Sequence, residues 1–439
     1  MIAPQRRREI VDALRRGTVP QRGLAAFAVG TDRFAAAIDD DLRVVSAGGA
    51  GFKAIRGEYG SGKTFAVRWL AERARNEGFA TAEVQISEGE TPLHHLETVY
   101  RRLCERLATT DTVGGALRTV IDSWLFALHD DAISSGADPN DEQAVGQAVD
   151  ALAERRLGTV ATQAPALAAV LRGYRAALAS GDAPLAEGLL AWLGGQPHVA
   201  ASVKRAAGIR GDLDHDVALA FLAGLLTILR GAGYAGLVLV LDEVETLQRV
   251  RSDVRDRSLN ALRQLIDEVD QGRYPGLYLV ITGTPSFFDG PQGVGRLPPL
   301  AQRLHTDFTT DPKFDNPRAI QLRLRGFDLD SLSEVGRRVR DLYAEGSDNR
   351  DRLVARCDDG YIQTLAAAVT GDLGGKVGVA PRVFLKKLVG DVLDRVDQFD
   401  DFDPRRNYKL TITDGELTDV EVNARAAASV EDIELDLES

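Results

Sequence analysis

The chain has 439 residues, of which 44% are hydrophobic and 27% are charged, and its formal net charge is −12. This length predicts two or three folded units, and the composition is typical of a soluble globular protein. The acidic total argues against a protein that coats nucleic acid by bulk charge, but it leaves room for a local basic surface. Two cysteines, Cys104 and Cys357, fit no metal motif and cannot form a disulfide framework, so we expect a reducing compartment.

No stretch of the sequence predicts a membrane span or a secretory leader. The longest apolar run, residues 217–229, has 13 residues, whereas a bilayer span needs ~20. The arginines at positions 6–8 are not followed by the apolar stretch of a signal peptide. Residues 411–439 hold nine acids against one arginine, and we expect the last of them to be disordered. The sequence therefore predicts a cytoplasmic protein that does not contact a membrane.

The first part of the chain predicts helices, followed by the start of an alternating strand–helix pattern. In order, the expected elements are helices over 6–16 and 24–41, a strand over 52–56, a helix over 65–75 and a strand over 81–87. Gly17 and Pro20 mark the end of the first helix, and residues 48–51 form a glycine-rich link into the first strand.

A long insertion is expected before the next strand. About 150 residues separate the second and third predicted strands, whereas a strand–helix–strand unit needs only ~30. This stretch is rich in alanine and leucine with helical periodicity, which argues against unbroken disorder. We therefore predict a helical insertion at about residues 90–231, with breaks near 134–141 and 194–198.

The alternating pattern then resumes and is followed by a separate helical unit. The expected elements are strands over 237–241, 277–282 and 319–324, core helices over 254–270 and 300–304, three further helices over 328–343, 351–369 and 381–396, and a hairpin over 407–422 with its turn at Asp414-Gly415. The predicted domains are an N-terminal helical segment over 1–50, an α/β core over 51–328 that carries the insertion, a helical lid over 329–400, and a hairpin with an acidic tail over 401–439.

The most informative motif is the run GEYGSGKT at residues 57–64, which fits GxxxxGK[ST]. A predicted strand precedes it and a predicted helix follows it, and in that context backbone N–H groups wrap nucleotide phosphates. Lys63 would reach the β- and γ-phosphates, and Thr64 would give its hydroxyl to Mg²⁺. The alternative, a glycine-rich turn that happens to precede Lys-Thr, does not account for the flanking elements. The predicted nucleotide-binding residues are Gly57, Glu58, Tyr59, Gly60, Ser61, Gly62, Lys63, Thr64 and Phe65.

A second motif supplies candidates for metal binding and catalysis. The apolar strand predicted at 237–241 runs directly into Asp242 and Glu243, which is the Walker B pattern. Asp242 would hold Mg²⁺, and Glu243 would orient and polarise the attacking water. A buried strand whose end happens to be acidic is common, but the phosphate-loop motif upstream favours the functional interpretation. Glu245 is interpreted as a surface or supporting residue.

Polar residues after the next strand are candidates to contact the γ-phosphate or the water. Thr282 and Thr284 both fit this role, and the sequence leaves the choice between them open. The alternative is that they cap the end of the strand.

Two arginines are further candidates. Arg303 lies near the end of the helix predicted at 300–304, where an arginine of an oligomeric ATPase reaches the γ-phosphate of the neighbouring subunit; Arg296 and Arg318 are its rivals. Arg382 lies in the first turn of the last long helix, after Pro381, and could point back toward bound nucleotide. An ordinary surface arginine is the alternative in each case.

The chain has no NKxD motif, which favours ATP over GTP, and no LSGGQ-like run, which argues against an ABC transporter.

The motifs GEYGSGKT, LVLVLDEVE, LVITGTP and APRVFLKKL, in this order, resemble those of AAA+ ATPases of the origin-recognition and helicase-loader type. More narrowly, RREIVDALRRGTVPQRGL, AEVQISEGETPLHHLETVYRRL and LDEVETLQR resemble the BrxD family of ATP-binding proteins from BREX phage-defence systems. The resemblance implies a P-loop core with a parallel five-stranded sheet and a helical lid, and it gives Arg382 the role of the sensor 2 arginine. Loader relatives usually carry a winged-helix domain after the lid. The residues past 396 look too few for one, so we expect any DNA contacts to come from the core, the insertion or the arginine-rich N-terminus.

These observations predict an ATPase that binds Mg·ATP between core and lid, forms homo-oligomers, and loads or regulates a partner helicase on DNA. The resemblance implies other BREX proteins as partners. Two alternatives remain open: a nucleotide-gated signalling switch with little turnover, and a scaffold that binds ATP only for stability.

Overall fold

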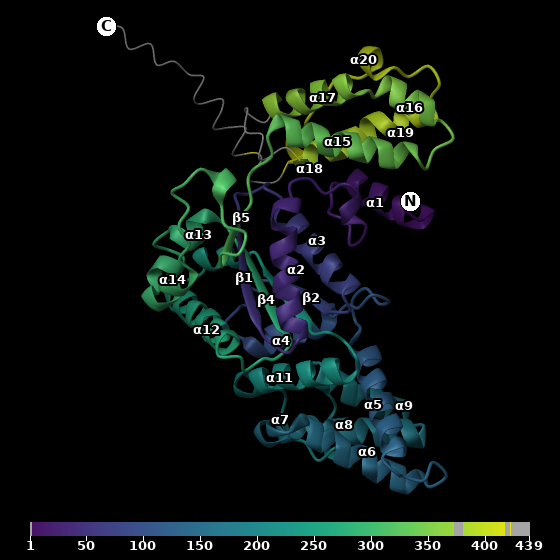
Figure 1. The fold of residues 1–439 in the computed structure, drawn as a ribbon, viewed down its shortest axis with the longest axis vertical. Helices are drawn as coiled ribbons and strands as arrows, with labels where there is room; N and C mark the ends of the chain where they lie inside the picture. The colour runs from purple at the N-terminus through teal and green to yellow at the C-terminus, as the bar shows by residue number, and fades with distance from the viewer. Residues whose placement is uncertain (1, 373–380, 418–421, 423–439) are drawn as a thin grey trace. The chain divides into compact units, whose positions relative to one another are not determined.

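The chain folds into α/β architecture with a five-stranded sheet whose strand order is β2-β3-β4-β1-β5. The structure is a computed structural model that describes residues 2–372, 381–417 and 422 (Figure 1). The strands are β1 (Gly51–Arg56), β2 (Ala80–Gln85), β3 (Leu237–Asp242), β4 (Leu277–Gly283) and β5 (Gln321–Arg323). The fold class expected from the sequence is confirmed, and each of the five predicted strands is found.

Contacts divide the chain into two compact units, each built from separate stretches of sequence. Unit 1 comprises Met1–Ala36, Ile55–Glu72 and Asp307–Ser439, and unit 2 comprises Ala37–Ala54 and Arg73–Thr306. This division differs from the linear domains predicted from the sequence, because the phosphate-loop segment is grouped with the C-terminal helices.

In unit 2 the sheet consists of β2, β3, β4 and the first residues of β1. β2 pairs with β3 and β3 pairs with β4, both in parallel, with Leu237 opposite Ala80 on one side and Leu277 on the other. Every residue of β3 and β4 is buried. A parallel strand covered on both faces needs continuous apolar side chains, which explains the sequence LVLVL.

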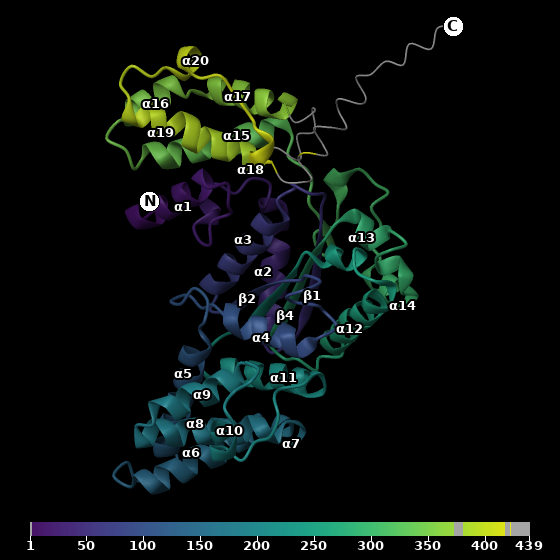
Figure 2. The same ribbon diagram turned by 180° about the vertical axis from the view of Figure 1, so that it is seen from behind.

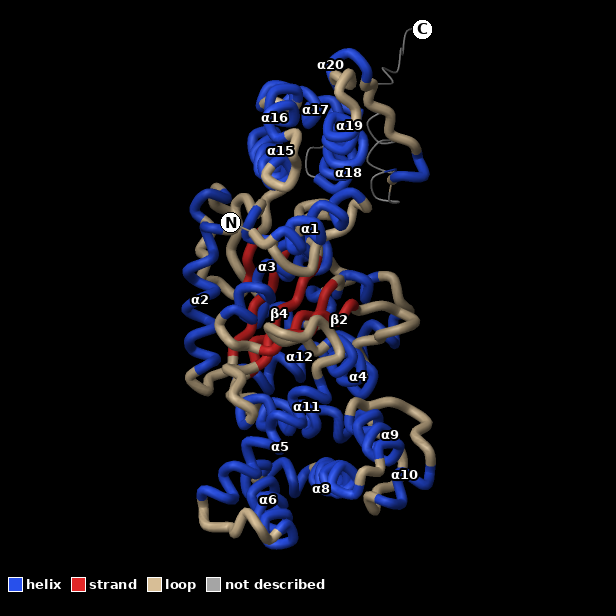
Figure 3. The backbone as a smooth tube through the Cα atoms, turned by 90° about the vertical axis from the view of Figure 1, so that its right-hand side faces the viewer, coloured by secondary structure: helices blue, strands red, loops and turns tan. Residues whose placement is uncertain are grey.

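Helices of unit 2 pack directly on these strands. α4 (Leu96–Arg106) contacts β2, and α12 (Ser252–Asp270) contacts β4. α2 (Asp32–Ser46) contributes Asp41, whose carboxylate accepts a hydrogen bond from the Tyr278 hydroxyl at 2.8 Å and pairs with Lys53 at 3.0 Å. The shorter α13 (Pro285–Asp289) and α14 (Pro298–Leu304) follow β4. The strands and the helices flanking them are distinguished by colour in Figure 3.

The insertion between β2 and β3 is helical, as its periodicity predicts. After α4 its helices are α5 (Leu117–Ser134), α6 (Glu142–Leu157), α7 (Thr159–Gln163), α8 (Pro165–Ser180), α9 (Ala183–Leu193), α10 (Ala201–Ala206) and α11 (His215–Gly231). Figure 2 shows α6, α8, α9 and α10 gathered together, with α11 next to them. The predicted breaks near 134–141 and 194–198 are present. Further breaks include those at Gly158 and Gly181, which take positive φ values of 52° and 72°.

The helices of unit 1 include the N-terminal α1 (Pro4–Arg15), which packs on the C-terminal helices. Arg15 joins them through a two-point ion pair with Asp394, with nitrogen–oxygen distances of 2.6 and 2.8 Å. α3 (Lys63–Asn76) starts in this unit. The C-terminal helices are α15 (Leu329–Ala344), α16 (Arg350–Arg356), α17 (Asp359–Asp372), α18 (Pro381–Lys386), the π-helical η6 (Lys387–Leu393), α19 (Asp394–Gln398) and α20 (Pro404–Asn407).

Two predictions for the C-terminal part need correction. The helix expected over 351–369 is two helices, because the Asp358 carboxylate accepts the Tyr361 N–H at 2.8 Å and starts a new helix. The hairpin expected over 407–422 shows no strand in its described residues 407–417 and 422, and Asp414–Glu416 form a 3₁₀ turn instead. The remaining residues of that prediction, and the acidic tail, lie outside the described residues. Among the helices that are described, none is both long and apolar enough to cross a bilayer.

Candidate functional site

The phosphate-loop motif lies in unit 1, where backbone conformation prepares it for an anion. Gly60 and Gly62 take φ values of 79° and 88°, in the left-handed region that favours glycine. α3 begins immediately afterwards at Lys63, and the Ala66 N–H donates to the Gly62 carbonyl at 2.8 Å. Left-handed residues that alternate with ordinary ones turn successive N–H groups toward one concave side, and the helix N-terminus adds partial positive charge there.

The side chain of Lys63 is held close to the loop itself. Lys63 is buried, and its ammonium group donates to the carbonyls of Gly57 and Glu58 at 2.9 and 3.3 Å. The same nitrogen lies 4.9 Å from the centre of the Tyr59 ring. A side chain at Gly57 would meet the Ser61 hydroxyl at 2.3 Å, so this position has room only for glycine. Thr64 is half-buried in the first turn of α3.

Phe65 anchors the start of α3 inside unit 1. Its ring lies edge-on to Phe27, with 5.3 Å between the ring centres. This position is therefore packed against protein, which supports the helix that carries Lys63 and Thr64.

The predicted Walker B pair, Asp242 and Glu243, lies in unit 2 at the carboxyl end of β3. Asp242 is 4% exposed, and its carboxylate accepts hydrogen bonds from the Thr282 hydroxyl and from the Glu243 N–H, the latter at 3.1 Å. Burial raises the pKa of Asp242 above its ordinary range, although the hydrogen bond from Thr282 opposes the shift. A buried carboxylate is costly unless a cation or hydrogen bonds compensate it, so this side chain is suited to a metal ion.

Glu243 adopts an unusual backbone conformation. Its φ and ψ are 60° and 42°, a left-handed geometry that residues other than glycine rarely adopt. Its N–H donates to the Thr282 hydroxyl at 3.0 Å, and its carboxylate accepts from the Gln85 amide at 2.9 Å. Strain of this kind concentrates at functional sites. Gln85 was not among the predicted site residues, although a polar residue near the carboxyl end of a predicted strand is a signal that could have indicated it.

The two threonines left open by the sequence have different surroundings. Thr282 is fully buried and bonds to both members of the Walker B pair. Thr284 is also buried, but its hydroxyl lies 2.9 Å from the Ser286 hydroxyl, and its carbonyl accepts the Phe287 N–H at the start of α13. The structure therefore brings Thr282, and not Thr284, into contact with Asp242.

Two of the candidate arginines, Arg303 and Arg296, form ion pairs within unit 2. Arg303 forms an ion pair with Asp267 on α12, and Arg296 forms one with Asp256 on the same helix. Arg318, in unit 1, is exposed. These contacts tie Arg296 and Arg303 to α12 within one chain, and they do not choose an arginine finger.

Arg382, in the first turn of α18, lies in the same unit as the phosphate loop. One of its terminal nitrogens donates to the Glu416 carbonyl at 2.7 Å. Glu416 also pairs with Lys387, at 2.9 Å. Burial acts to raise the pKa of Glu416, but hydrogen bonding and charge from Lys387 outweigh it and lower the pKa to about 2. The segment around Glu416 is thereby held against α18.

Each of two groups of residues, the phosphate loop and the predicted Walker B pair, taken by itself, suits one part of a nucleotide with its magnesium ion. The left-handed glycines and the N-terminus of α3 suit phosphates, and Asp242 suits a cation. Within the described residues no three His, Cys, Asp or Glu side chains gather into a group that could hold a metal. Mg²⁺ beside a nucleotide does not need such a group, because one or two carboxylates and the phosphates commonly suffice.

The parallel sheet and the phosphate loop that follows β1 together define an α/β protein of the P-loop type. Residues 2–412 match the model of the family described as BREX system ATP-binding protein BrxC/D. The chain belongs to this family. It is therefore an ATP-binding protein of a BREX phage-defence system, and other BREX proteins are its partners. No curated protein and no solved structure matches the chain.

Proposed function

We propose that this chain is an AAA+ ATPase of the BrxD type, which hydrolyses ATP to ADP and phosphate in the cytoplasm and uses the energy to load or regulate a partner helicase on DNA. The observation that carries the proposal is the arrangement at the end of β3, where a buried Asp242 and a strained Glu243 share hydrogen bonds with Thr282. Nucleotide binding alone requires the phosphate loop. It does not require a strained, polar residue such as Glu243 directly after a buried aspartate.

Each candidate residue has a distinct role in this proposal. The loop N–H groups and Lys63 bind the phosphates, and Thr64 with Asp242 would hold Mg²⁺, which neutralises phosphate charge when bound. Glu243 orients and polarises the attacking water, with Thr282 fixing its backbone. We assign no step to Thr284, because it bonds to Ser286.

The arginines would connect hydrolysis to conformational work. In this proposal Arg382, as sensor 2, contacts bound nucleotide from α18, and Arg303 contacts the nucleotide of a neighbouring copy in a homo-oligomer. Arg303 would have to exchange its partner Asp267 for a phosphate. The Asp267 side chain is only 18% exposed, so opening this ion pair has a cost that contacts to the nucleotide would have to offset. Arg296 and Arg318 stay as alternatives to Arg303.

The decisive test is Glu243→Gln. This variant should bind ATP as the unaltered chain does and should lose turnover by about 100-fold or more, because an amide cannot polarise water as a carboxylate does. Steady-state phosphate release and binding of a fluorescent ATP analogue separate the two effects. Glu142→Gln, an exposed position on α6, is the matched control and should leave both unchanged. Hydrolysis by Glu243→Gln at the normal rate would remove the assignment of the base.

The same variant tests assembly and DNA binding. Native mass measurement of Glu243→Gln with Mg·ATP, with and without duplex DNA, should show an oligomer that gains the mass of DNA. A monomer that binds ATP but gains neither a copy nor DNA would favour the nucleotide-gated switch or the scaffold.

A further inference from the structure

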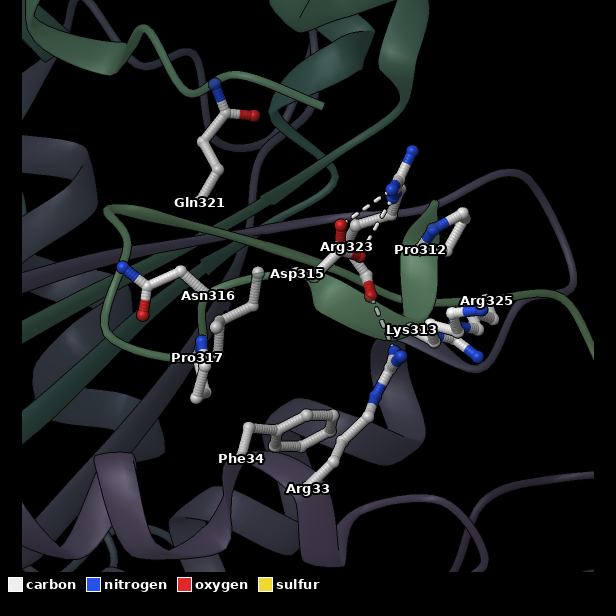
Figure 4. A pocket seen from close by; sticks show the side chains of 11 residues that line it. Arg33, Phe34, Pro312, Lys313, Asp315, Asn316, Pro317, Gln321, Arg323 and Arg325 are labelled. Atoms are coloured by element: carbon white, nitrogen blue, oxygen red, sulfur yellow. Dashed lines mark hydrogen bonds and ion pairs between the residues drawn. The ribbon is translucent and has the colours of Figure 1, made fainter. Parts of the chain in front are cut away.

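A cationic pocket in unit 1 has no role in ATP binding as proposed above. It has a volume of about 260 Å³ and lies between the start of α2 and the segment that leads into and through β5. Four cationic side chains and one carboxylate, that of Asp315, line it; the cations are Arg33, Lys313, Arg323 and Arg325. Figure 4 shows Arg33 extending from α2 toward the segment that carries Lys313 and Asp315. A chain with an acidic total thus concentrates positive charge at one concave place.

The carboxylate of Asp315 forms its ion pair with Arg323, and its charge also acts on Arg33, so one carboxylate faces several cations. Arg323 forms a two-point ion pair with Asp315, with nitrogen–oxygen distances of 2.6 and 2.9 Å (Figure 4). Lys313 has a partner in Asp311 at 3.3 Å, but both side chains are more than half exposed, so this pair is weak. Burial lowers the pKa of Arg33, and the nearby charges of Arg325 and Arg323 lower it further, although the charge of Asp315 opposes the shift. The like charges therefore repel one another, and an anion in the pocket would relieve that repulsion.

The pocket has an apolar base and an exposed aromatic ring beside it. Phe34 and Leu322 are each 4% exposed and contribute apolar surface to the lining. Phe314 is 70% exposed, and the Lys313 ammonium lies 4.8 Å from the centre of its ring. A large exposed aromatic residue next to clustered cations is the combination on which single-stranded nucleic acids bind, with bases stacked on rings and phosphates on cations.

We propose that this pocket binds the phosphate backbone of a single-stranded nucleic acid, with Arg33, Lys313 and Arg325 contacting phosphates and Phe314 stacking on a base. A duplex fits less well, because its bases are already stacked and cannot cover Phe314. An acidic peptide would satisfy the cations but would leave the exposed ring unused.

The pocket is also connected to the phosphate loop within unit 1. The guanidinium carbons of Arg323 and of Arg56, the residue before the loop, lie 4.8 and 4.7 Å from the centre of the same ring, Phe308. The Leu324 N–H donates to the Arg56 carbonyl at 2.8 Å. A single-stranded nucleic acid bound in the pocket would therefore contact residues that pack next to Arg56, the residue before the phosphate loop.

The test measures binding of fluorescein-labelled dT20 to the full chain by anisotropy, without nucleotide, so that it does not depend on the proposed ATPase activity. The double variant Arg33→Glu with Arg325→Glu should weaken binding by about tenfold or more. The slope of log Kd against log salt concentration should also decrease by about 1.4. Each single-strand phosphate contact contributes about 0.7 to this slope, and the variant removes two contacts. The milder pair Arg33→Gln with Arg325→Gln should lose affinity in the same direction, which guards against misfolding as the cause.

The matched control is Arg205→Glu with Arg210→Glu, two exposed arginines of the insertion that give the same change in net charge. It should leave binding within about twofold. Equal loss in both double variants would mean that bulk charge, not the pocket, binds the oligonucleotide, and no loss in the pocket variant would overturn the proposal outright.

Two further measurements identify the kind of ligand. Phe314→Ala should weaken dT20 binding by about fivefold or more and leave binding of a 20-base-pair duplex unchanged; equal effects on both would overturn the stacking role. A 20-residue poly-glutamate peptide should need at least about ten times the concentration of unlabelled dT20 to displace the label. Displacement at equal concentration would instead assign the pocket to an acidic peptide.

Discussion

The phosphate loop follows β1, and Asp242 and Glu243 lie at the carboxyl end of β3. These two regions are built in different ways. In the loop, the backbone conformation of Gly60 and Gly62 creates the site, and the bonds of Lys63 are to main-chain carbonyls. At the end of β3, side chains create it, because Asp242 and Glu243 depend on Thr282 from another strand. The loop is therefore local in sequence, whereas the Walker B end needs residues that lie 40 positions apart.

The largest expected effect in this comparison belongs to the loop. Lys63→Ala should weaken binding of an ATP analogue by about 100-fold or more, because it removes the one positive side chain of the motif from the phosphates. Isothermal titration measures the affinity. Lys204→Ala, a lysine of the insertion that pairs with Asp212, serves as the control and should bind ATP normally. Tight binding by Lys63→Ala would show that backbone N–H groups alone hold the phosphates.

The corresponding change at the end of β3 should affect stability as well as turnover. Thr282→Val keeps the shape of the side chain but removes the hydroxyl that bonds to the Asp242 carboxylate and to the Glu243 N–H. The loss of these bonds should lower the free energy of unfolding by about 1–3 kcal/mol. We expect turnover to fall by about tenfold with little change in ATP affinity.

Chemical denaturation and phosphate release check these two effects. Thr370→Val is the matched control, since that buried hydroxyl donates within its own helix, to the Ala366 carbonyl at 2.8 Å. If Thr282→Val were as stable and active as this control, the hydrogen bonds around Asp242 would have no role in catalysis.

A glycine substitution separates backbone strain from phosphate binding. Gly62→Ala places a Cβ where φ is 88° and should cost about 1 kcal/mol of stability and roughly tenfold in ATP affinity. Gly181→Ala, at φ 72° with nothing within 4 Å of the new atom, should cost the same stability and no ATP affinity. Thermal unfolding with and without ATP measures both. Equal ATP affinity in the two variants would remove Gly62 from the site.

The smallest effect concerns the segment that Arg382 contacts. Because the pKa of Glu416 is about 2 in the folded chain and 4.5 ordinarily, its ionised form stabilises the fold above pH 4.5, and this stabilisation is lost as the pH falls from 4.5 toward 2. Glu416→Gln should therefore lower the unfolding free energy by about 1 kcal/mol at pH 7, and the difference from the unaltered chain should vanish near pH 2. Denaturation curves at several pH values test this. A difference that does not change with pH would mean that the charge of Glu416 is not involved.

Most of the fold could be predicted from periodicity, because the strands of a parallel sheet are continuous apolar runs and the insertion repeats at helical spacing. The errors came where short-range hydrogen bonds act. Asp358 splits a predicted helix by capping a new one, and residues 408–413 have no strand despite the turn signal of Asp414-Gly415. Neither effect is visible in hydrophobic spacing.

The candidate site was predictable to different degrees. The phosphate loop and Asp242 follow from motifs in the chain, but the choice of Thr282 over Thr284 required knowing which hydroxyl points toward β3. Gln85 and the cationic pocket were not predicted, since their members are separated by long stretches of sequence. Arg33 and Arg325 lie nearly 300 residues apart and share one lining.

The sequence by itself determined which residues can cradle phosphate, because a loop built from left-handed glycines before a helix needs only consecutive residues. It also determined the sheet and the helical insertion, because burial imposes a period on the side chains. Only the tertiary structure decided which hydroxyl bonds to Asp242 and which arginines share one pocket. Hydrogen bonds and like-charge clusters depend on distances of a few ångströms between residues that the chain order keeps far apart.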